Sequence, residues 1–284
     1  MLSVKSLNRR TIAKLASATL VLLTSVVMAG YVYKLSLKKE IKWVNKPDIP
    51  IANFEHLVLN SKYLGHEVGI GVKLPADYES SNKNYNVLYF LHGAGGNEIS
   101  DVAGISGFIK SILKELGLAD PIIVMPNGGD SQYQGQVEPM IIEELIPYID
   151  NHYRTKAQPQ TRLAAGFSMG GAGAIRLSIR HPNTFGGAIS WAGGMWSKDF
   201  KLLADAAINS GELRDNQFFA LMINGEYDRP TVFVQLEKVF NEVRVEHKRV
   251  VLPGVDHNFG HYLELSKPEV TDFLQRSWGT PPPL

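Results

Sequence analysis

The chain of 284 residues is 44% hydrophobic and 20% charged, a balance that is ordinary for a globular protein with a buried core. Its formal net charge of +1 is not the excess of positive charge that nucleic-acid-binding proteins usually carry, so no nucleic-acid partner is expected. The absence of cysteine excludes disulfides, thiolate metal sites and a cysteine nucleophile.

The first 39 residues have the features of a targeting segment. Basic residues precede an uncharged apolar run over residues 15–33, "LASATLVLLTSVVMAGYVY", and lysines follow it. A run of this length fits either a membrane anchor or a secretory signal, for which Val27-Met28-Ala29 is a passable cleavage site. We expect residues 1–39 to be a signal peptide or an uncleaved anchor that contacts the membrane. Because more basic residues precede the run than directly follow it, the rest is expected to be exported, to the periplasm or outside the cell.

Residues 40–52, which contain two prolines and no periodicity, are predicted to be a linker before a domain over residues 53–284. In chain order, alternation and short apolar runs predict strands at 54–60, 66–75, 87–96, 121–129, 161–167, 185–193, 217–225 and 247–254. Helical spacing predicts helices at 108–117, 137–153, 170–182, 231–243 and 261–278. Pro147 is expected to kink or break the second of these helices.

Strands that alternate with helices predict an α/β fold, in which a mostly parallel central sheet carries helices on both faces. In this fold class the carboxyl ends of the strands meet at one edge of the sheet, where active-site residues gather.

One such strand end carries the motif Gly166-Phe167-Ser168-Met169-Gly170, which joins the predicted strand 161–167 to the predicted helix 170–182. A G-x-S-x-G string alone is weak evidence, but strand, turn and helix form the context that a nucleophilic serine requires. The flanking glycines let strand and helix pass closely, and the Met169 N–H lies at the positive end of the helix. We predict that Ser168 is the nucleophile and that Met169 supplies one oxyanion donor. The alternative is a turn serine that caps the helix.

A nucleophilic serine needs a base, which in turn needs an orienting carboxylate, in the chain order Ser, acid, His. Asp228 follows the predicted strand 217–225 and is the predicted acid, with Glu226 as its rival. His257 lies in the loop after the last predicted strand and is the predicted base, with His261 as the alternative.

A metal pair formed by His257 and His261 is rejected, because the intervening Glu is missing and Gly260 disfavours a helix there. No metal and no cofactor is expected.

The second oxyanion donor is expected from the segment "HGAGGNE", residues 92–98, at the glycine-rich end of the predicted strand 87–96. Gly93 and Gly95 allow a tight turn in which the Ala94 N–H faces the nucleophile. His92 is interpreted as a support that braces this turn through hydrogen bonds, not as the base.

With these residues assembled, the chain resembles the esterase D / feruloyl esterase branch of the α/β-hydrolase superfamily over about residues 54–276. The segments that carry the resemblance occur in the family's order and spacing: "VKLPADY", "YNVLYFLHGAGG", "IIVMPNGG", "IIEELIPYIDNHYRT", "RLAAGFSMGGAGAIRLSIRHPNTFGGAISWAGG", "NGEYD" and "PGVDHNFGHY". The resemblance implies the α/β-hydrolase fold, with Ser168 as nucleophile, Asp228 as acid and His257 as base. Many members carry a tryptophan shortly after the catalytic histidine, where this chain has Asn258-Phe259, so its acyl or leaving-group pocket is expected to differ.

These residues predict a serine carboxylic-ester hydrolase that acts through an acyl-enzyme on a small-molecule or glycan-linked ester. Two alternatives stay open: acyl transfer to a sugar or lipid alcohol by the same triad, and an inactive binding module on a hydrolase fold. Trp191 and Trp196 are candidates both for lining the substrate cleft and for packing in the core.

Overall fold

The computed structural model describes four ranges of the chain: residues 41–194, 197–215, 217–229 and 231–279. The chain divides into two compact units, Met1–Ile41 and Lys42–Leu284. The predicted targeting segment 1–39 lies outside the described residues. Within the described ranges, every helix is too short or too polar to cross a membrane.

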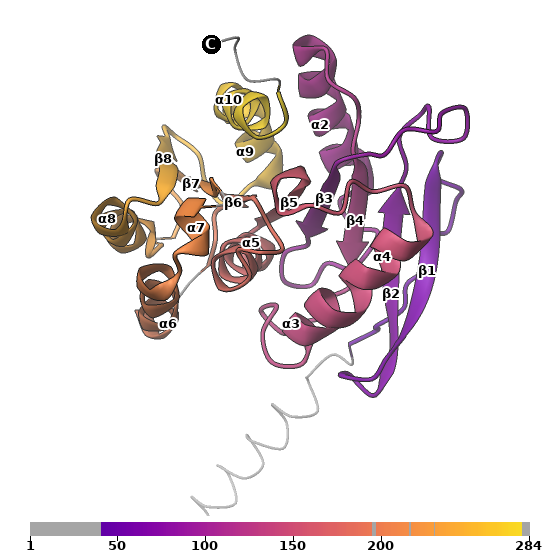
Figure 1. Ribbon diagram of the computed structural model, residues 1–284, viewed down its shortest axis with the longest axis horizontal. Helices are drawn as coiled ribbons and strands as arrows, with labels where there is room; N and C mark the ends of the chain where they lie inside the picture. The colour runs from indigo at the N-terminus through magenta and orange to yellow at the C-terminus, as the bar shows by residue number, and fades with distance from the viewer. Residues whose placement is uncertain (1–40, 195–196, 216, 230, 280–284) are drawn as a thin grey trace, which may run out of the picture. The chain divides into compact units, whose positions relative to one another are not determined.

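An eight-stranded sheet organises the second unit, with its strands in the order β1-β2-β4-β3-β5-β6-β7-β8 (Figure 1). The strands are β1 (Phe54–Ser61), β2 (His66–Lys73), β3 (Val87–Leu91), β4 (Ile122–Pro126), β5 (Arg162–Phe167), β6 (Gly187–Trp191), β7 (Phe219–Gly225) and β8 (Glu246–Leu252). The strands from β4 to β8 pair in parallel, whereas β2 is antiparallel to both β1 and β4. The predicted mostly parallel sheet is therefore confirmed, with antiparallel pairing at one edge.

Helices cover both faces of this sheet, as predicted (Figure 1). The first face carries α2 (Val102–Leu116), α9 (Phe259–Leu265) and α10 (Lys267–Trp278). The second face carries α3 (Val137–Pro139), the π-helical segment η1 (Met140–Leu145), α4 (Ile146–His152), α5 (Met169–Arg180), α6 (Ser197–Asn209), α7 (Glu212–Asp215) and α8 (Phe233–Val243). A short 3-10 helix, η2 (Pro159–Thr161), leads into β5.

The central strands are apolar at almost every position because both of their faces are covered. In β5, Leu163 and Ala165 pack in the cluster that includes α2 and α10, whereas Ala164 packs in the cluster that includes α4. In β3, Phe90 faces the first cluster and Tyr89 the second. Each cluster is therefore built from alternate residues of the same strands, which fixes their register.

The structure differs from the predicted helices at several places. Helix α2 begins at Val102, earlier than predicted, because two glycines in its first turns obscure the helical pattern. Pro147 does not break the chain's helical path: a π-helical segment precedes it, and Pro147 lies in the first turn of α4, where its missing N–H costs little. Helices α6 and α7 were not predicted, and the predicted terminal helix is divided at Ser266 into α9 and α10.

Part of the segment predicted as a linker is hydrogen-bonded to the sheet. The Gly69 N–H of β2 donates to the Trp43 carbonyl over 2.7 Å. The Asn127 side chain donates to the Lys42 and Trp43 carbonyls over 3.1 and 3.0 Å. The compact unit accordingly begins at Lys42.

The approach of α5 to β3 leaves no room for a side chain at Gly170, so a substitution there tests this packing. A Cβ atom at Gly170 would lie 1.8 Å from the Leu91 carbonyl oxygen. We expect Gly170→Ala to lower the free energy of unfolding by about 3 kcal/mol or more, because backbone on both sides must move. Gly104 in α2 has no atom within 4 Å of such a Cβ. There, Gly104→Ala is expected to stabilise by about 0.5–1 kcal/mol. Urea unfolding of both variants measures the contrast, and shifts of the same sign and size would contradict it.

Candidate active site

Ser168 adopts a backbone conformation that residues other than glycine rarely adopt. Its φ is 56° and its ψ is −115°, at the junction of β5 and α5. Backbone hydrogen bonds hold this turn from both sides. The Ser168 N–H donates to the Trp191 carbonyl over 2.8 Å, and its carbonyl accepts from the N–H groups of Ala172 and Gly194 over 3.0 and 3.2 Å. The Ser168 side chain thereby stands at the carboxyl edge of the sheet.

The structure brings together the three residues predicted as nucleophile, base and acid. His257 Nε2 lies 3.0 Å from Ser168 Oγ. On the other side of the ring, His257 Nδ1 lies 2.9 and 2.8 Å from the two carboxylate oxygens of Asp228. A carboxylate at Nδ1 fixes the proton on that nitrogen, so Nε2 is left to accept the proton of the Ser168 hydroxyl.

The Asp228 carboxylate is held in place by donors on every side. Its side chain is only 2% exposed. Besides His257, it accepts from the Tyr262 hydroxyl over 2.7 Å and from the Arg229 N–H over 2.6 Å. Burial raises the pKa of the Asp228 carboxyl, but the hydrogen bonds from Tyr262, His257 and Arg229 outweigh burial and hold that pKa below its ordinary value. Asp228 is therefore ionised at neutral pH.

Tyr262 was not predicted from the sequence. Its hydroxyl donates to Asp228 and accepts from the Gly225 N–H over 2.5 Å, so it ties the acid to the end of β7. Its side chain is fully buried, and burial followed by the contact with Asp228 raises the pKa of its hydroxyl, which keeps it a donor. No sequence signal marks this tyrosine, because its role depends on how α9 folds back beneath the His257 loop.

The rival residues have other partners. Glu226 accepts from the Gly254 N–H over 2.8 Å in the loop that follows β8. The His261 ring lies 3.4 Å from Asp256, on the exposed side of α9. Among the described residues, no group of three imidazole or carboxylate side chains could hold a metal ion.

Aromatic rings pack behind the imidazole. The Phe167 ring lies 4.6 Å from the His257 ring, and Phe259 stacks on Phe167 at 4.9 Å. Phe259 therefore packs in this aromatic stack. In the sequence it lies near the position where many members of the family that the chain resembles carry tryptophan. Trp191 is fully buried and donates to the Ser266 hydroxyl, so it belongs to the core; Trp196 lies outside the described residues.

The glycine-rich segment after β3 approaches Ser168. A Cβ atom at Gly93 would lie 3.7 Å from Ser168 Cβ. The Gly96 N–H donates to the Gly93 carbonyl over 3.0 Å, which closes a tight turn around Ala94, and Gly95 has a φ of 77°. The N–H groups of Ala94 and Met169 therefore belong to the two backbone segments that flank the nucleophile.

His92 braces this turn. Its Nδ1 lies 2.8 Å from the Gly93 carbonyl, and its Nε2 accepts from the Gly128 N–H over 2.9 Å. This pattern requires the neutral ring, with the proton on Nδ1. Burial lowers the pKa of His92, which favours the same neutral form.

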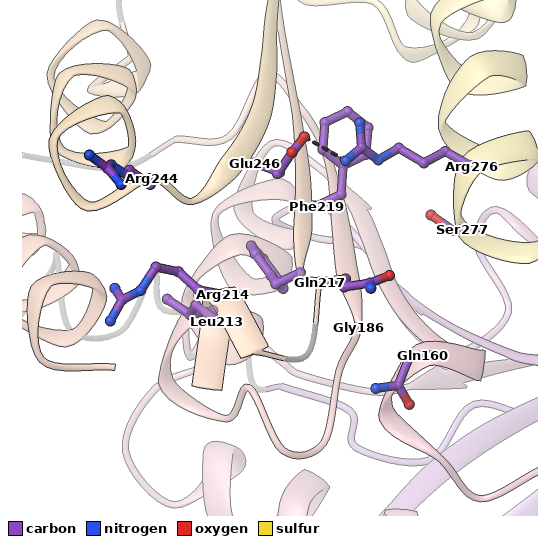
Figure 2. Close-up of a pocket in the computed structure, with 11 residues that line it drawn as sticks. Gln160, Gly186, Leu213, Arg214, Gln217, Phe219, Arg244, Glu246, Arg276 and Ser277 are labelled. Atoms are coloured by element: carbon purple, nitrogen blue, oxygen red, sulfur yellow. Dashed lines mark hydrogen bonds and ion pairs between the residues drawn. The ribbon is translucent and has the colours of Figure 1, made fainter. Parts of the chain in front are cut away.

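A separate cavity of about 390 Å³ lies at the opposite edge of the sheet (Figure 2). Its lining includes Gly186, Phe219 and Glu246, which lie where β6, β7 and β8 begin. Arg276 pairs with Glu246 across it. Because Ser168 follows the carboxyl end of β5, this cavity is not part of the candidate active site.

The strain at Ser168 can be measured with two substitutions. We expect Ser168→Gly to be about 1 kcal/mol more stable than Ser168→Ala, because glycine adopts a φ of 56° without steric cost. At Ser178, inside α5, the order should reverse: Ser178→Gly is expected to be about 1 kcal/mol less stable than Ser178→Ala. Urea midpoints of the four variants give both differences. The same order at the two positions would contradict strain at Ser168.

Tyr262→Phe removes the hydroxyl that links Asp228 to Gly225. We expect a loss of about 1–3 kcal/mol in the free energy of unfolding at neutral pH, because the buried Gly225 N–H loses its acceptor. The hydrogen bonds that lower the pKa of Asp228 stabilise the folded state at every pH above the ordinary pKa of an aspartate. This stabilisation is lost as the pH falls through the lowered pKa of Asp228. The gap between wild type and variant should therefore narrow as the pH falls below about 4, the ordinary pKa of an aspartate, in urea titrations.

Tyr227→Phe is the matched control, since Tyr227 is 73% exposed. It should leave stability nearly unchanged at every pH. A gap for Tyr262→Phe that stays constant or widens as the pH falls would show that its hydroxyl does not act on the ionised carboxylate.

Comparison with known proteins gives a family. The model of the family described as "Putative esterase" matches residues 61–222, more than half of the chain. Esterase Rv1288 of Mycobacterium tuberculosis is 33% identical over 164 residues, which cover 54% of this chain and 35% of that protein. The endo-1,4-beta-xylanase/feruloyl esterase of Xylanibacter ruminicola is 32% identical over 168 residues, which cover 54% of this chain and 23% of that protein. The chain thus spans about a third or less of the length of these relatives.

Solved structures show the same fold. A ferulic acid esterase matches with a TM-score of 0.66 at 20% identity, over 79% of this chain and 98% of that chain. The S-formylglutathione hydrolase FrmB of Staphylococcus aureus matches with a TM-score of 0.59 at 18% identity, over 78% of this chain and 98% of that chain. The fold is that of the α/β hydrolases, and by its match over residues 61–222 the chain belongs to the esterase family.

Proposed function

We propose that this protein is a serine carboxylic-ester hydrolase that acts through an acyl-enzyme. One observation carries the proposal: a continuous hydrogen-bonded chain runs from Ser168 Oγ through both nitrogens of His257 to the Asp228 carboxylate. A nucleophile, a base that faces it and an orienting carboxylate are the three groups that acyl transfer requires. The esterase names of the relatives support the same chemistry.

In the first half-reaction, Ser168 Oγ attacks the ester carbonyl while His257 Nε2 takes its proton. Asp228 remains ionised, keeps the imidazole in the required tautomer and stabilises the imidazolium. His257 then returns the proton to the leaving alcohol as the bond between carbonyl carbon and alkoxy oxygen breaks. The product is an ester between the acyl group and Ser168.

The negative charge on the carbonyl oxygen is assigned to two backbone donors, the N–H groups of Ala94 and Met169. Met169 directly follows Ser168 and is the first residue of α5, where the helix dipole favours negative charge. Ala94 follows Gly93, which approaches Ser168. Fixed donors of this kind supply a large share of the rate in acyl transfer.

Hydrolysis is favoured over transfer to a sugar or lipid alcohol by the position of the base. The His257 side chain is 39% exposed. Water therefore reaches the imidazole that must activate the second nucleophile, whereas a transferase has to exclude it. Water attacks the acyl-enzyme, His257 takes its proton, and Ser168 is regenerated with release of the carboxylic acid.

We infer that the substrate is a small-molecule or glycan-linked ester, with esters of hydroxycinnamic acids as the first candidates. The feruloyl esterase in the name of the Xylanibacter ruminicola relative supports this class. The apolar segment at residues 15–33 supports export, by a cleaved signal or by a tether in the membrane.

The proposal is tested by hydrolysis of p-nitrophenyl acetate and methyl ferulate by the full chain. We expect turnover by the wild type and a loss of about three or more decades in Ser168→Ala, because the nucleophile is removed. Ser178→Ala is the matched control, since Ser178 lies in the same helix and its hydroxyl has no hydrogen-bond partner among the described residues. It should keep wild-type rates. Equal activity in wild type and Ser168→Ala would overturn the mechanism.

A further inference from the structure

Glu98 is a fully buried carboxylate that the proposed triad does not use. It ends the segment from His92 to Glu98 that carries the Ala94 donor. Removing a carboxylate from water is unfavourable unless donors replace its hydration. The contacts of Glu98 therefore identify the groups that determine where this end of the segment lies.

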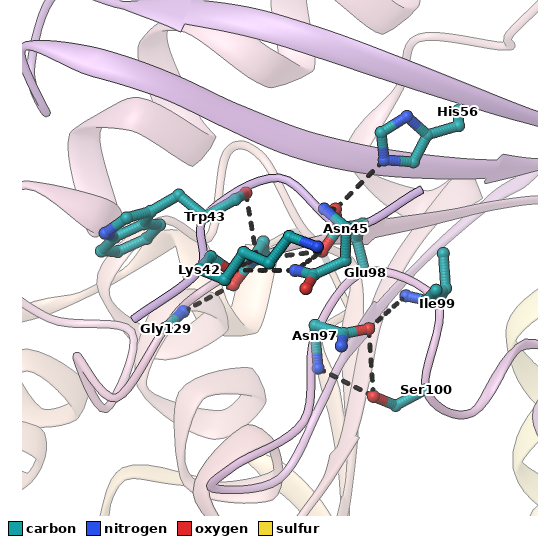
Figure 3. Close-up of polar contacts among 10 residues, drawn as sticks. Lys42, Trp43, Asn45, His56, Asn97, Glu98, Ile99, Ser100 and Gly129 are labelled. Carbon is teal, nitrogen blue, oxygen red and sulfur yellow. Dashed lines mark hydrogen bonds and ion pairs between the residues drawn. The ribbon is translucent and has the colours of Figure 1, made fainter. Parts of the chain in front are cut away.

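Four donors from three distant parts of the chain converge on Glu98 (Figure 3). Asn45 contributes both its backbone N–H to Oε1 and its side-chain amide to Oε2, the latter over 3.1 Å. His56 Nε2 in β1 lies 3.1 Å from Oε1, and the Asn127 amide donates to Oε2 over 2.9 Å. Of these partners only His56 is titratable, and neutral amide groups supply the other three hydrogen bonds to the carboxylate.

Two glycines of β2 make room for this residue. A Cβ atom at Gly69 would lie 1.9 Å from Glu98 Oε1, and one at Gly71 would lie 2.5 Å from the Glu98 carbonyl oxygen. Glycine is disfavoured inside a strand, so its presence at both positions fits a close approach of another segment. The sheet is thus shaped to accept Glu98.

Both ends of the oxyanion segment, residues 92–98, are fixed to the same turn after β4. At the first end, His92 Nε2 accepts from the Gly128 N–H over 2.9 Å. At the second end, Glu98 accepts from Asn127, whose side-chain oxygen accepts from the Gly129 N–H over 2.9 Å. The turn 127–129 therefore fixes the two ends of the segment that contains Ala94.

The residues Lys42–Asn45, which we call the strap, close this arrangement from outside. The Lys42 and Trp43 carbonyls accept from the Asn127 amide, and Asn45 bonds Glu98 directly. The Trp43 carbonyl also accepts from Gly69 in β2. The strap is thereby connected to the turn, to the sheet and to the oxyanion segment.

We propose that Glu98 and the strap are positioning elements of the active site, which hold the oxyanion segment so that the Ala94 N–H meets the developing oxyanion. This role rests on the proposed esterase function. A donor that acts only on the oxyanion stabilises the transition state and not the bound ester. Loosening the segment should consequently slow acylation and leave substrate binding nearly unchanged.

The test uses the full chain carrying Asn45→Ala, Glu98→Gln or both. Asn45→Ala is the mild variant, because it removes one amide and keeps the backbone donor. Asn60→Ala is the matched control at the exposed far end of β1. Stopped-flow acylation by p-nitrophenyl acetate gives the acylation rate constant and the substrate dissociation constant separately. Phenylboronic acid forms a tetrahedral adduct with serine that places a negatively charged oxygen against the oxyanion donors, so its affinity reports on them without an acyl-transfer step.

We expect the acylation rate constant to fall about tenfold in Asn45→Ala and up to about 100-fold in Glu98→Gln, with substrate dissociation constants within about twofold of the wild type. Affinity for phenylboronic acid should fall in parallel. Because Asn45 acts through Glu98, the double variant should be no slower than Glu98→Gln alone. Circular dichroism at the assay temperature verifies that each variant is folded.

Two results would separate this role from the proposed function. If the wild type neither reacts with p-nitrophenyl acetate nor binds phenylboronic acid, the esterase proposal fails and the positioning role fails with it. If the wild type does both, and folded Asn45→Ala and Glu98→Gln match it in acylation and in boronate affinity, only the positioning role is overturned. Variants that change substrate binding alone would also overturn it.

Discussion

The strained backbone of Ser168 is the constraint on which the site depends. A serine with φ of 56° and ψ of −115° persists only where its surroundings fix it. The N–H of Ser168 is bonded to β6, its carbonyl accepts from two N–H groups, and α5 starts at the next residue. Glycine at 170 lets this helix pass the end of β3 at a distance that excludes a side chain. The packing of the parallel strands thus supplies the energy that holds the hydroxyl above the sheet.

Three further strand ends meet the serine at this edge. The segment after β3 brings Gly93 against Ser168, the end of β7 supplies Asp228, and the loop after β8 supplies His257. Each is held by a neighbour outside the proposed triad: the buried His92 for the first, the buried Tyr262 for the second and the partly buried Phe167 ring for the third. Such support is what keeps a catalytic geometry within the narrow tolerance that it needs.

The sequence predicted the parts of this arrangement that depend on local pattern. The buried strands from β3 to β7 read as apolar runs, and G-x-S-x-G between a strand and a helix predicted the position of Ser168. Asp228 and His257 followed from their places after strand ends. Tyr262, Asn45 and Glu98 could not be predicted, because the partners described above lie 29 to 53 positions away along the chain and only the fold brings them together. The π-helical segment before Pro147 and helix α6 were not predicted either, because neither has a distinctive sequence signal.

The most direct test of the account is to locate a covalent adduct. A fluorophosphonate reacts only with a serine that an adjacent base has activated. After labelling of the full chain and digestion, mass spectrometry should find one adduct per chain, on the peptide that contains Ser168, and labelling should be lost in His257→Ala. An adduct on another serine, or labelling of Ser168 that is unchanged in His257→Ala, would contradict the claim that Ser168, His257 and Asp228 act as one catalytic unit.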